Sequence, residues 1–284
     1  LSIGVTFFPQ DAAVVNDLLR NADTAMYRAK DEGRNKYHLF TADLNAQAVE
    51  RLSIESALRH ALDRDELFLC YQPKINLQTG GIAGVEALVR WRHPHRGLVS
   101  PVEFIPVAEE TGLIVPIGEW VLRRACADAT RWSELGLDEV DVAVNLSARQ
   151  FRQGDLLRTV NDVLSEFTFD PNRLELEITE SLLMQDMQAS QVALYDLKAL
   201  GLEIYLDDFG TGYSSLAYLK KFPIDALKID RSFIRDIPGN TDDEAITRAI
   251  VALGQALRLK VVAEGVETDA QLGFLNREGC DEVQ

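Results

Sequence analysis

Two adjacent aspartates, Asp207 and Asp208, end the apolar run of the segment YLDDFGTGYSSL, residues 205–216, and a glycine-bearing loop follows them. Neighbouring ionised carboxylates repel each other, and removing each one from water costs several kcal/mol. A metal cation held between them would offset that repulsion, so the pair is a candidate for part of a metal site. The alternatives are an Asx-type turn or a helix cap, with glycines that only permit a tight bend.

Polar side chains also lie at or near the ends of five other apolar runs. In chain order they are Glu86, Asn145, Glu177, Lys228 with Asp230, and Glu264. The carboxyl ends of the strands in a β/α barrel meet on one face, where active sites lie. Oxygen ligands on a common rim suit Mg²⁺ or Mn²⁺, and Asp208 beside Asp207 could help to hold a second ion. Taken singly, a glutamate at a strand end is more often a surface or salt-bridged residue, and Lys228 could be an ordinary ion-pair partner.

The strands that must position these residues are β-rich runs separated mostly by helical patterns. The runs are ELFLCYQP, GVEALVRW, VDVAVNLS, RLELEITE, EIYLDDFG, ALKID, KVVAEGVE and CDEVQ. Segments such as GEWVLRRACADATRWSEL and DEAITRAIVALGQALRL carry helical periodicity between them. Strand alternating with helix about eight times predicts an α/β fold, a closed TIM-like (β/α)8 barrel.

The first two runs depart from this alternation. Only INLQTGG separates them, which is too short for a parallel crossover and suits a hairpin. The barrel is therefore predicted to have an antiparallel first strand. A helix is predicted to start at Ser100-Pro101-Val102-Glu103, which reads as a capping box with proline at the first helical position.

The N-terminal segment has a pattern of its own. Residues 1–10 are predicted to form a strand that runs into Pro9, and Ala13 to Lys30 a helix that ends before Gly33. These residues cannot bury a core alone. Residues 41–62 have helical spacing and are predicted to form a helix that links two domains. Because the chain starts within a strand-like segment without an initiator Met, we expect it to be a fragment of a longer protein.

Composition and charge narrow the class of partner. The 284 residues are 46% hydrophobic and 26% charged, as in globular proteins. The net charge of 29 − 45 = −16 argues against binding to a DNA or RNA polymer. Three scattered cysteines and the lack of a membrane-length apolar run predict a cytoplasmic fragment. An anchor of the full-length protein in the inner membrane is left open.

The motifs named above make Leu52 to Gln284 resemble the EAL family of cyclic di-GMP phosphodiesterases. They are YQP (71–73), EALVRW (86–91), SPVEFIPVAEETGL (100–113), NLS (145–147), EITE (177–180), DDFGTGYSSL (207–216), LKID (227–230) and EGVE (264–267). The start of the chain resembles the end of a GGDEF diguanylate cyclase domain. The resemblance implies a GGDEF fragment at 1–40, a linker helix at 41–54 and an EAL domain at 55–284 whose C-terminal end is incomplete.

The family resemblance also implies an activity, which is hydrolysis of cyclic di-GMP to linear pGpG with two Mg²⁺ or Mn²⁺ ions. It assigns Glu86, Asn145, Glu177 and Asp207 to the first metal, and Asp207, Asp208 and Glu264 to the second. Lys228 would contact the attacking water, with the general base left open between a lysine and a glutamate such as Glu264, and Glu180 would hold the DDFGTGYSSL loop. The implied substrate contacts are Gln72, Leu88, Arg90, Asp230, Glu267 and Gln284.

The sequence leaves two alternatives to an active enzyme open. Degenerate EAL domains bind cyclic di-GMP without cleaving it, although every expected ligand is present here. An interaction scaffold that uses the linker helix would leave the carboxylates unexplained. The resemblance further implies a homodimer through the EAL domain, whose contact orders residues 209–216, and an upstream GGDEF or sensor region of the same chain.

Overall fold

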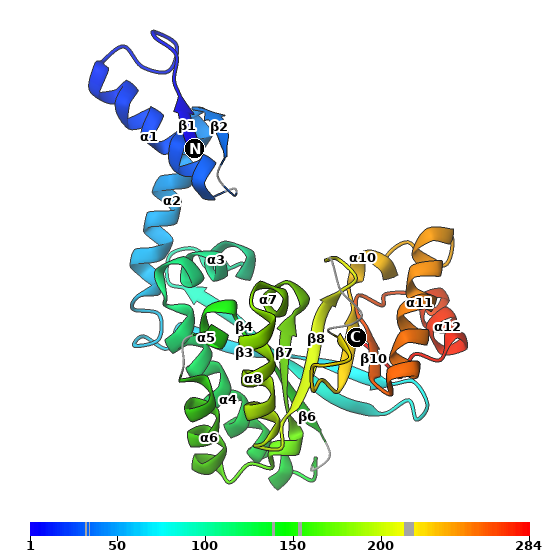
Figure 1. The fold of residues 1–284 in the computed structure, drawn as a ribbon. Coiled ribbons are helices and arrows are strands. Elements are labelled where there is room, and N and C mark those ends of the chain that lie inside the picture. The colour runs from blue at the N-terminus through cyan, green and yellow to red at the C-terminus, as the bar shows by residue number, and fades with distance from the viewer. Residues whose placement is uncertain (32, 34, 138–139, 153–154, 213–218) are drawn as a thin grey trace. The chain divides into compact units, whose positions relative to one another are not determined.

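The computed structural model describes residues 1–31, 33, 35–137, 140–152, 155–212 and 219–284 (Figure 1). It separates into two compact units, which are described one at a time. The first comprises Leu1–Asp65 and Val102–Thr111, and the second comprises Glu66–Pro101 and Gly112–Gln284. None of the helices in these described ranges is both long enough and apolar enough to cross a membrane.

The first unit is a small α/β assembly. Its elements are β1 (Ser2–Val5), α1 (Val15–Asp31), β2 (Lys36–Leu39), α2 (Ala42–Leu58) and most of α3 (Pro101–Thr111). The strands β1 and β2 are parallel, and Gly4 lets β1 approach α1, because a Cβ there would lie 1.8 Å from the carbonyl oxygen of Ala22. The strand is shorter than the predicted 1–10, and α2 ends before residue 62. The structure starts α3 after Ser100 as predicted, but the Ser100 side chain makes no capping hydrogen bond, so the predicted capping box was wrong.

The second unit is a closed barrel of eight strands. They are β3 (Leu67–Asn76), β4 (Ile82–His93), β6 (Asp141–Asn145), β7 (Leu174–Thr179), β8 (Glu203–Phe209), β9 (Ala226–Ile229), β10 (Lys260–Ala263) and β11 (Glu282–Val283). Strand β3 closes the ring and is antiparallel to both of its neighbours, β4 and β11, whereas the other neighbouring pairs are parallel. The predicted antiparallel first strand is thus confirmed. A ninth strand, β5 (Gly97–Val99), extends β4 as a short hairpin.

Helices follow most of the parallel strands, as the alternating pattern predicted (Figure 1). They are α4 (Ile114–Glu134), α5 (Ala148–Arg152), α6 (Leu156–Phe167), the 3₁₀ turn η1 (Pro171–Arg173), α7 (Glu180–Gln185), α8 (Met187–Lys198), α10 (Arg231–Ile234), α11 (Thr241–Leu257) and α12 (Asp269–Glu278). Helix α12 begins with a complete capping box, in which Thr268 and Gln271 exchange hydrogen bonds.

The alternating residues of strand β7 face two different regions: the apolar layer between the strands and the helices, and the interior of the barrel. Leu174, Leu176 and Ile178 are fully buried on one face, and Glu175 and Glu177 alternate with them. Because successive side chains of a strand point to opposite faces, the leucines and the isoleucine pack outward under the helices while both glutamates enter the barrel. The interior of this barrel is therefore partly charged, where branched apolar residues usually dominate.

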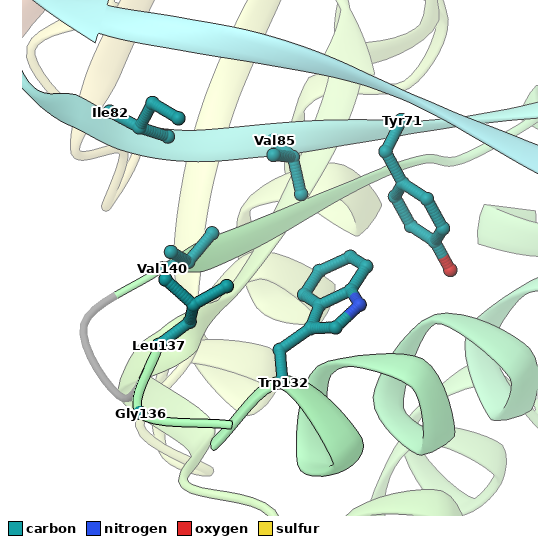
Figure 2. Close-up of a pocket in the computed structure, with 7 residues that line it drawn as sticks. All are labelled: Tyr71, Ile82, Val85, Trp132, Gly136, Leu137 and Val140. Carbon is teal, nitrogen blue, oxygen red and sulfur yellow. The ribbon is translucent and has the colours of Figure 1, made fainter. Parts of the chain in front are cut away.

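An apolar pocket of about 560 Å³ lies on the outer side of the β3–β4 hairpin. Figure 2 shows Tyr71 and Val85 pointing from the hairpin toward Trp132 of α4. The Tyr71 and Trp132 rings meet edge to face with centroids 4.6 Å apart, and the Tyr71 hydroxyl donates to Asp128 at 2.9 Å. None of the predicted site residues lines this pocket, so it is separate from the predicted chemistry.

Candidate active site at the mouth of the barrel

The centre of the candidate site is the ammonium group of Lys228 on β9. Its side chain is fully buried, and Nζ lies 2.6 Å from Glu264 and 2.7 Å from Glu177. The carboxylates of Glu86 and Asp207 each lie 3.5 Å from the same atom. Burial lowers the pKa of Lys228, but the four carboxylates raise it by more, so the net pKa is well above the ordinary value and the group is charged. Four carboxylates, three on strands β4, β7 and β8 and one directly after β10, therefore converge on one ammonium.

Glu86 is held by amide groups on both of its oxygens. The Asn145 side-chain nitrogen donates to Oε1 at 2.5 Å, and the Gln284 side-chain nitrogen donates to Oε2 at 2.6 Å. Burial raises the pKa of Glu86, but Lys228 and these two hydrogen bonds outweigh it, so the net pKa is lowered. The residue lies in the middle of β4 and not near its end as predicted, because β4 continues past the rim to pair with β5.

The aspartate pair lies at an irregularity of β8. The register between β8 and β9 shifts between Leu206 and Phe209, and Asp208 adopts a left-handed conformation with φ of 55°. Aspartate tolerates this conformation better than most residues, and such bulges redirect side chains. The backbone N–H of Asp208 donates to the Asp207 carboxylate at 2.9 Å. Burial, together with the charges of Asp207 and Asp230, raises the pKa of Asp208.

Two glutamates of the site hold protons unusually tightly. Burial raises the pKa of Glu177 to about 8 against the opposing effect of Lys228. Burial and the nearby Asp207 and Glu86 raise the pKa of Glu264 to about 7, again against Lys228. The single ammonium of Lys228 therefore does not neutralise all of the carboxylates that surround it.

The donor chemistry of this site fits divalent metal ions. Within the described residues, no three His, Cys, Asp or Glu side chains are already arranged around one point as ligands; the carboxylates meet the ammonium instead. Glu177 Oε1 is nonetheless buried with no hydrogen-bond partner, which is costly unless another group binds it. The donors are hard oxygens, which Mg²⁺ and Mn²⁺ prefer.

Glu180 begins α7 next to the glycine loop. Its Oε2 accepts a hydrogen bond from the backbone of Gly210 at 3.2 Å, and a Cβ at Gly212 would lie 2.6 Å from its Oε1. The absence of a side chain at Gly212 thus allows the loop backbone to approach the buried carboxylate closely. The second half of the predicted loop, residues 213–216, lies outside the described residues.

The residues predicted to contact the substrate differ in burial and in their contacts, whereas the four clustered carboxylates all meet Lys228. Leu88 and Arg90 are partly buried and follow Glu86 at two-residue spacing, on the same face of β4. Asp230 caps α10 by accepting from the backbone of Ser232 at 3.0 Å. Gln284 contacts Glu86, while Gln72 and Glu267 are exposed.

Sequence reasoning missed a second polar layer inside the barrel. Lys74 and Glu175, both almost fully buried, form an ion pair there. A signal was present in the run LELEIT, since Glu175 and Glu177 are two residues apart and must share a face.

Comparison with known families and proteins identifies the fold. The family model for the EAL domain matches residues 55–284, and the model for the diguanylate cyclase, GGDEF domain matches residues 1–36. The chain belongs to the EAL domain family. The EAL domain here contains the barrel and every residue of the carboxylate cluster.

Similar proteins carry this domain within longer chains. The bifunctional diguanylate cyclase/cyclic di-GMP phosphodiesterase MucR of Pseudomonas aeruginosa is 51% identical over 283 residues, which cover 100% of this chain and 41% of that protein. The cyclic di-GMP phosphodiesterase PdeR of Escherichia coli is 42% identical over 283 residues, which cover 100% of this chain and 42% of PdeR. The chain thus spans about two fifths of the length of these relatives.

Solved structures of other EAL domains have the same fold. A structure of the PaMucR phosphodiesterase in complex with c-di-GMP has a TM-score of 0.80 at 52% identity, covering 82% of this chain and 94% of that chain. The EAL enzyme Bd1971, in its form bound to cAMP and cyclic-di-GMP, has a TM-score of 0.80 at 32% identity, covering 97% of this chain and 72% of that chain.

Proposed function

We propose that the EAL domain of this chain hydrolyses one phosphodiester bond of cyclic di-GMP to give linear pGpG. The observation that carries the proposal is the convergence of Glu86, Glu177, Asp207 and Glu264 on Lys228 at the barrel mouth. Membership of the EAL family and similarity to MucR and PdeR, both named cyclic di-GMP phosphodiesterases, support the choice of substrate.

The carboxylates are proposed to hold two divalent ions, Mg²⁺ or Mn²⁺. The first would be held by Glu86, Asn145, Glu177 and Asp207, and the second by Asp207, Asp208 and Glu264. When bound, such ions stabilise charge on the phosphate and make a bound water more acidic. Within the chain, Asn145 and Gln284 keep Glu86 oriented, while Glu180 holds the loop after Asp208.

Lys228 and Glu264 are proposed to handle the proton of the attacking water. Their charged groups are 2.6 Å apart, and because Lys228 is already a charged ammonium, the Glu264 carboxylate is the member of the pair that can take up the proton leaving the water. The remaining predicted contacts, Gln72, Leu88, Asp230, Glu267 and Gln284, are proposed to face the nucleotide. Arg90 is proposed to add a bidentate phosphate contact, which would offset part of the repulsion between a dianionic ligand and a chain of charge −16.

The direct test is incubation of the purified protein with cyclic di-GMP and Mg²⁺ or Mn²⁺, followed by chromatography. We expect pGpG to form with either ion and not with Ca²⁺ alone, because Ca²⁺ favours looser and higher coordination. Tight binding of cyclic di-GMP without pGpG would favour the receptor alternative. Comparable turnover in Ca²⁺ would contradict the proposed metal chemistry.

We also propose that the active form is a homodimer through the EAL domain, with a contact that orders residues 209–216. Its basis is the family resemblance together with the packing of Gly210 and Gly212 against Glu180, which links the loop to the site. Sedimentation velocity at the enzyme concentration of the assay should give a dimer, with specific activity falling on dilution. A monomer of full activity would exclude this proposal.

The placement of the domain in the cell and in the longer protein is also proposed. Residues 1–40 would end an upstream GGDEF or sensor region, 41–54 would link it, and 55–284 would form the EAL domain. A cytoplasmic location agrees with three free cysteines, Cys70, Cys126 and Cys280, in the part of the chain that the structure describes.

A further inference from the structure

We propose that Lys74 is a positioning residue for the carboxylates of the site. Its buried side chain contacts three other strands of the barrel, one layer of side chains below Glu86, Glu177 and Asp207. This inference rests on the proposed metal-binding role of those carboxylates.

The contacts of Lys74 extend across the barrel interior from β3. Its ammonium forms an ion pair with Glu175 on β7, and both side chains are almost fully buried. The same ammonium lies 4.6 Å from the centroid of the Tyr205 ring on β8. Its stem lies against Gly84 of β4, where a Cβ would come within 3.2 Å of Lys74 Cε. A glycine at this position gives the lysine room to cross the barrel.

Each of the three contacted residues lies two positions before a candidate metal ligand. Gly84 precedes Glu86, Glu175 precedes Glu177, and Tyr205 precedes Asp207. Residues two apart on a strand share a face and are separated by roughly 6.5 Å along it. Lys74 therefore contacts the residue beneath each of three ligands, on three different strands.

A second lysine extends this layer toward the last strand. Lys260 Nζ lies 2.8 Å from the Tyr205 hydroxyl and 3.1 Å from Glu282 Oε1. Glu282 lies two residues before Gln284, which binds Glu86. The polar layer thus extends to β11, which directly precedes the Gln284 that holds Glu86.

Stability alone does not account for a buried charged pair in this place. The desolvation of two ions often cancels their attraction, and well-packed apolar residues of similar volume are commonly as stable. The interior layers of such barrels are usually filled by branched apolar side chains. An ion pair between β3 and β7 does, however, fix the position of one strand relative to the other. An apolar contact fixes that position less specifically.

The position of the strands matters because metal ligands must be placed to within roughly 0.5 Å. Groups behind the ligands typically change metal affinity or activity by about 10–100-fold when they are removed. We therefore expect loss of the Lys74–Glu175 pair to weaken metal binding without changing the ligands themselves.

The test is the double variant Lys74→Met/Glu175→Leu, titrated with Mn²⁺ alone in the absence of nucleotide. Free Mn²⁺ is measured by electron paramagnetic resonance, so the readout does not depend on turnover. We expect about tenfold weaker Mn²⁺ binding, a melting temperature within a few degrees of the wild type, and a lower kcat with KM little changed. The substitution is neutral in net charge, so a simple electrostatic effect predicts no change.

The single variant Lys74→Met separates the two explanations further. Removal of a positive charge beneath the site would tighten cation binding by electrostatics alone, whereas loss of positioning would weaken it. If the double variant does not fold, the more conservative charge-neutral pair Lys74→Gln/Glu175→Gln decides the question by the same Mn²⁺ titration. The matched control is Lys198→Met/Asp225→Asn, which removes the ion pair of 2.7 Å between α8 and the segment before β9 and should leave Mn²⁺ affinity unchanged.

Wild-type Mn²⁺ affinity and kcat in the double variant, or tighter binding in Lys74→Met, would overturn the positioning role. Failure of the wild-type protein itself to bind Mn²⁺ would instead defeat the proposed metal site. The two failures are therefore distinguishable.

Discussion

Asp207→Asn is expected to lower the rate of cyclic di-GMP hydrolysis at least about a thousandfold, or roughly 4 kcal/mol of transition-state stabilisation, while the barrel stays folded. Asp207 is the one side chain proposed to bind both ions. Its Oδ1 accepts the backbone N–H of Asp208 at 2.9 Å, and an asparagine oxygen can keep that bond. The substitution therefore removes the negative charge with little change in shape.

The measurement combines the rate of pGpG formation with the melting temperature. Asp162→Asn on α6 is the matched control, since it removes a charge from an exposed aspartate that pairs with Arg158 and is not one of the site residues. We expect the control to retain its rate and both variants to melt near the wild type. A rate within tenfold of the wild type for Asp207→Asn would show that the ligands are misassigned.

Glu86→Ala should also abolish hydrolysis, but it is a less selective change. Asn145 and Gln284 both donate to this carboxylate, so the alanine leaves two amide groups without their partner. A buried polar group that loses its partner costs roughly 1–3 kcal/mol. Some of the effect of Glu86→Ala will therefore be structural, and the Asp207→Asn result carries more weight.

Much of the barrel follows from local patterns in the sequence. Apolar runs that end on polar residues gave the strands and their ends, and the short link INLQTGG between the first two runs gave the antiparallel hairpin. These features were predictable because the length of a connection limits which strands it can join. The convergence of Glu177, Asp207 and Glu264 then followed from the geometry of barrels in general.

The features that could not be predicted depend on partners distant in the sequence. Glu86 lies within β4 because the strand continues outside the barrel, and only the pairing with β5 shows this. The bulge at Asp207 and Asp208 depends on the register with β9. Lys74 and Glu175 are 101 residues apart, so periodicity placed Glu175 inside the barrel but could not name its partner.

The second large effect is expected when the ammonium of Lys228, which balances the charge of the carboxylates, is removed. Lys228→Met is expected to lower the free energy of unfolding by about 3–5 kcal/mol in the presence of a chelator. The side chain is fully buried, and its ammonium is the shared counter-ion of Glu86, Glu177, Asp207 and Glu264. Methionine fills a similar volume, so the loss is mainly that of the charge.

Mn²⁺ should raise the free energy of unfolding of Lys228→Met more than it raises that of the wild type. A ligand that binds only the folded state adds stability as RT ln(1 + [L]/Kd), about 2.7 kcal/mol at a concentration of 100 Kd. Without the ammonium, the carboxylates present more negative charge to Mn²⁺ and should bind it more tightly. Hydrolysis should nevertheless fall at least about a hundredfold, because the group proposed to contact the attacking water is gone.

Thermal unfolding with chelator and with Mn²⁺, for Lys228→Met and the wild type, measures both effects. Lys198→Met is the matched control, because it removes a lysine from a more exposed ion pair of the same unit. Equal melting temperatures of wild type and Lys228→Met in chelator would show that the carboxylates do not need the ammonium. An Mn²⁺-induced rise in melting temperature that is larger in the variant, together with lost hydrolysis, would mean that Lys228 opposes metal binding in the resting protein and is retained for the reaction.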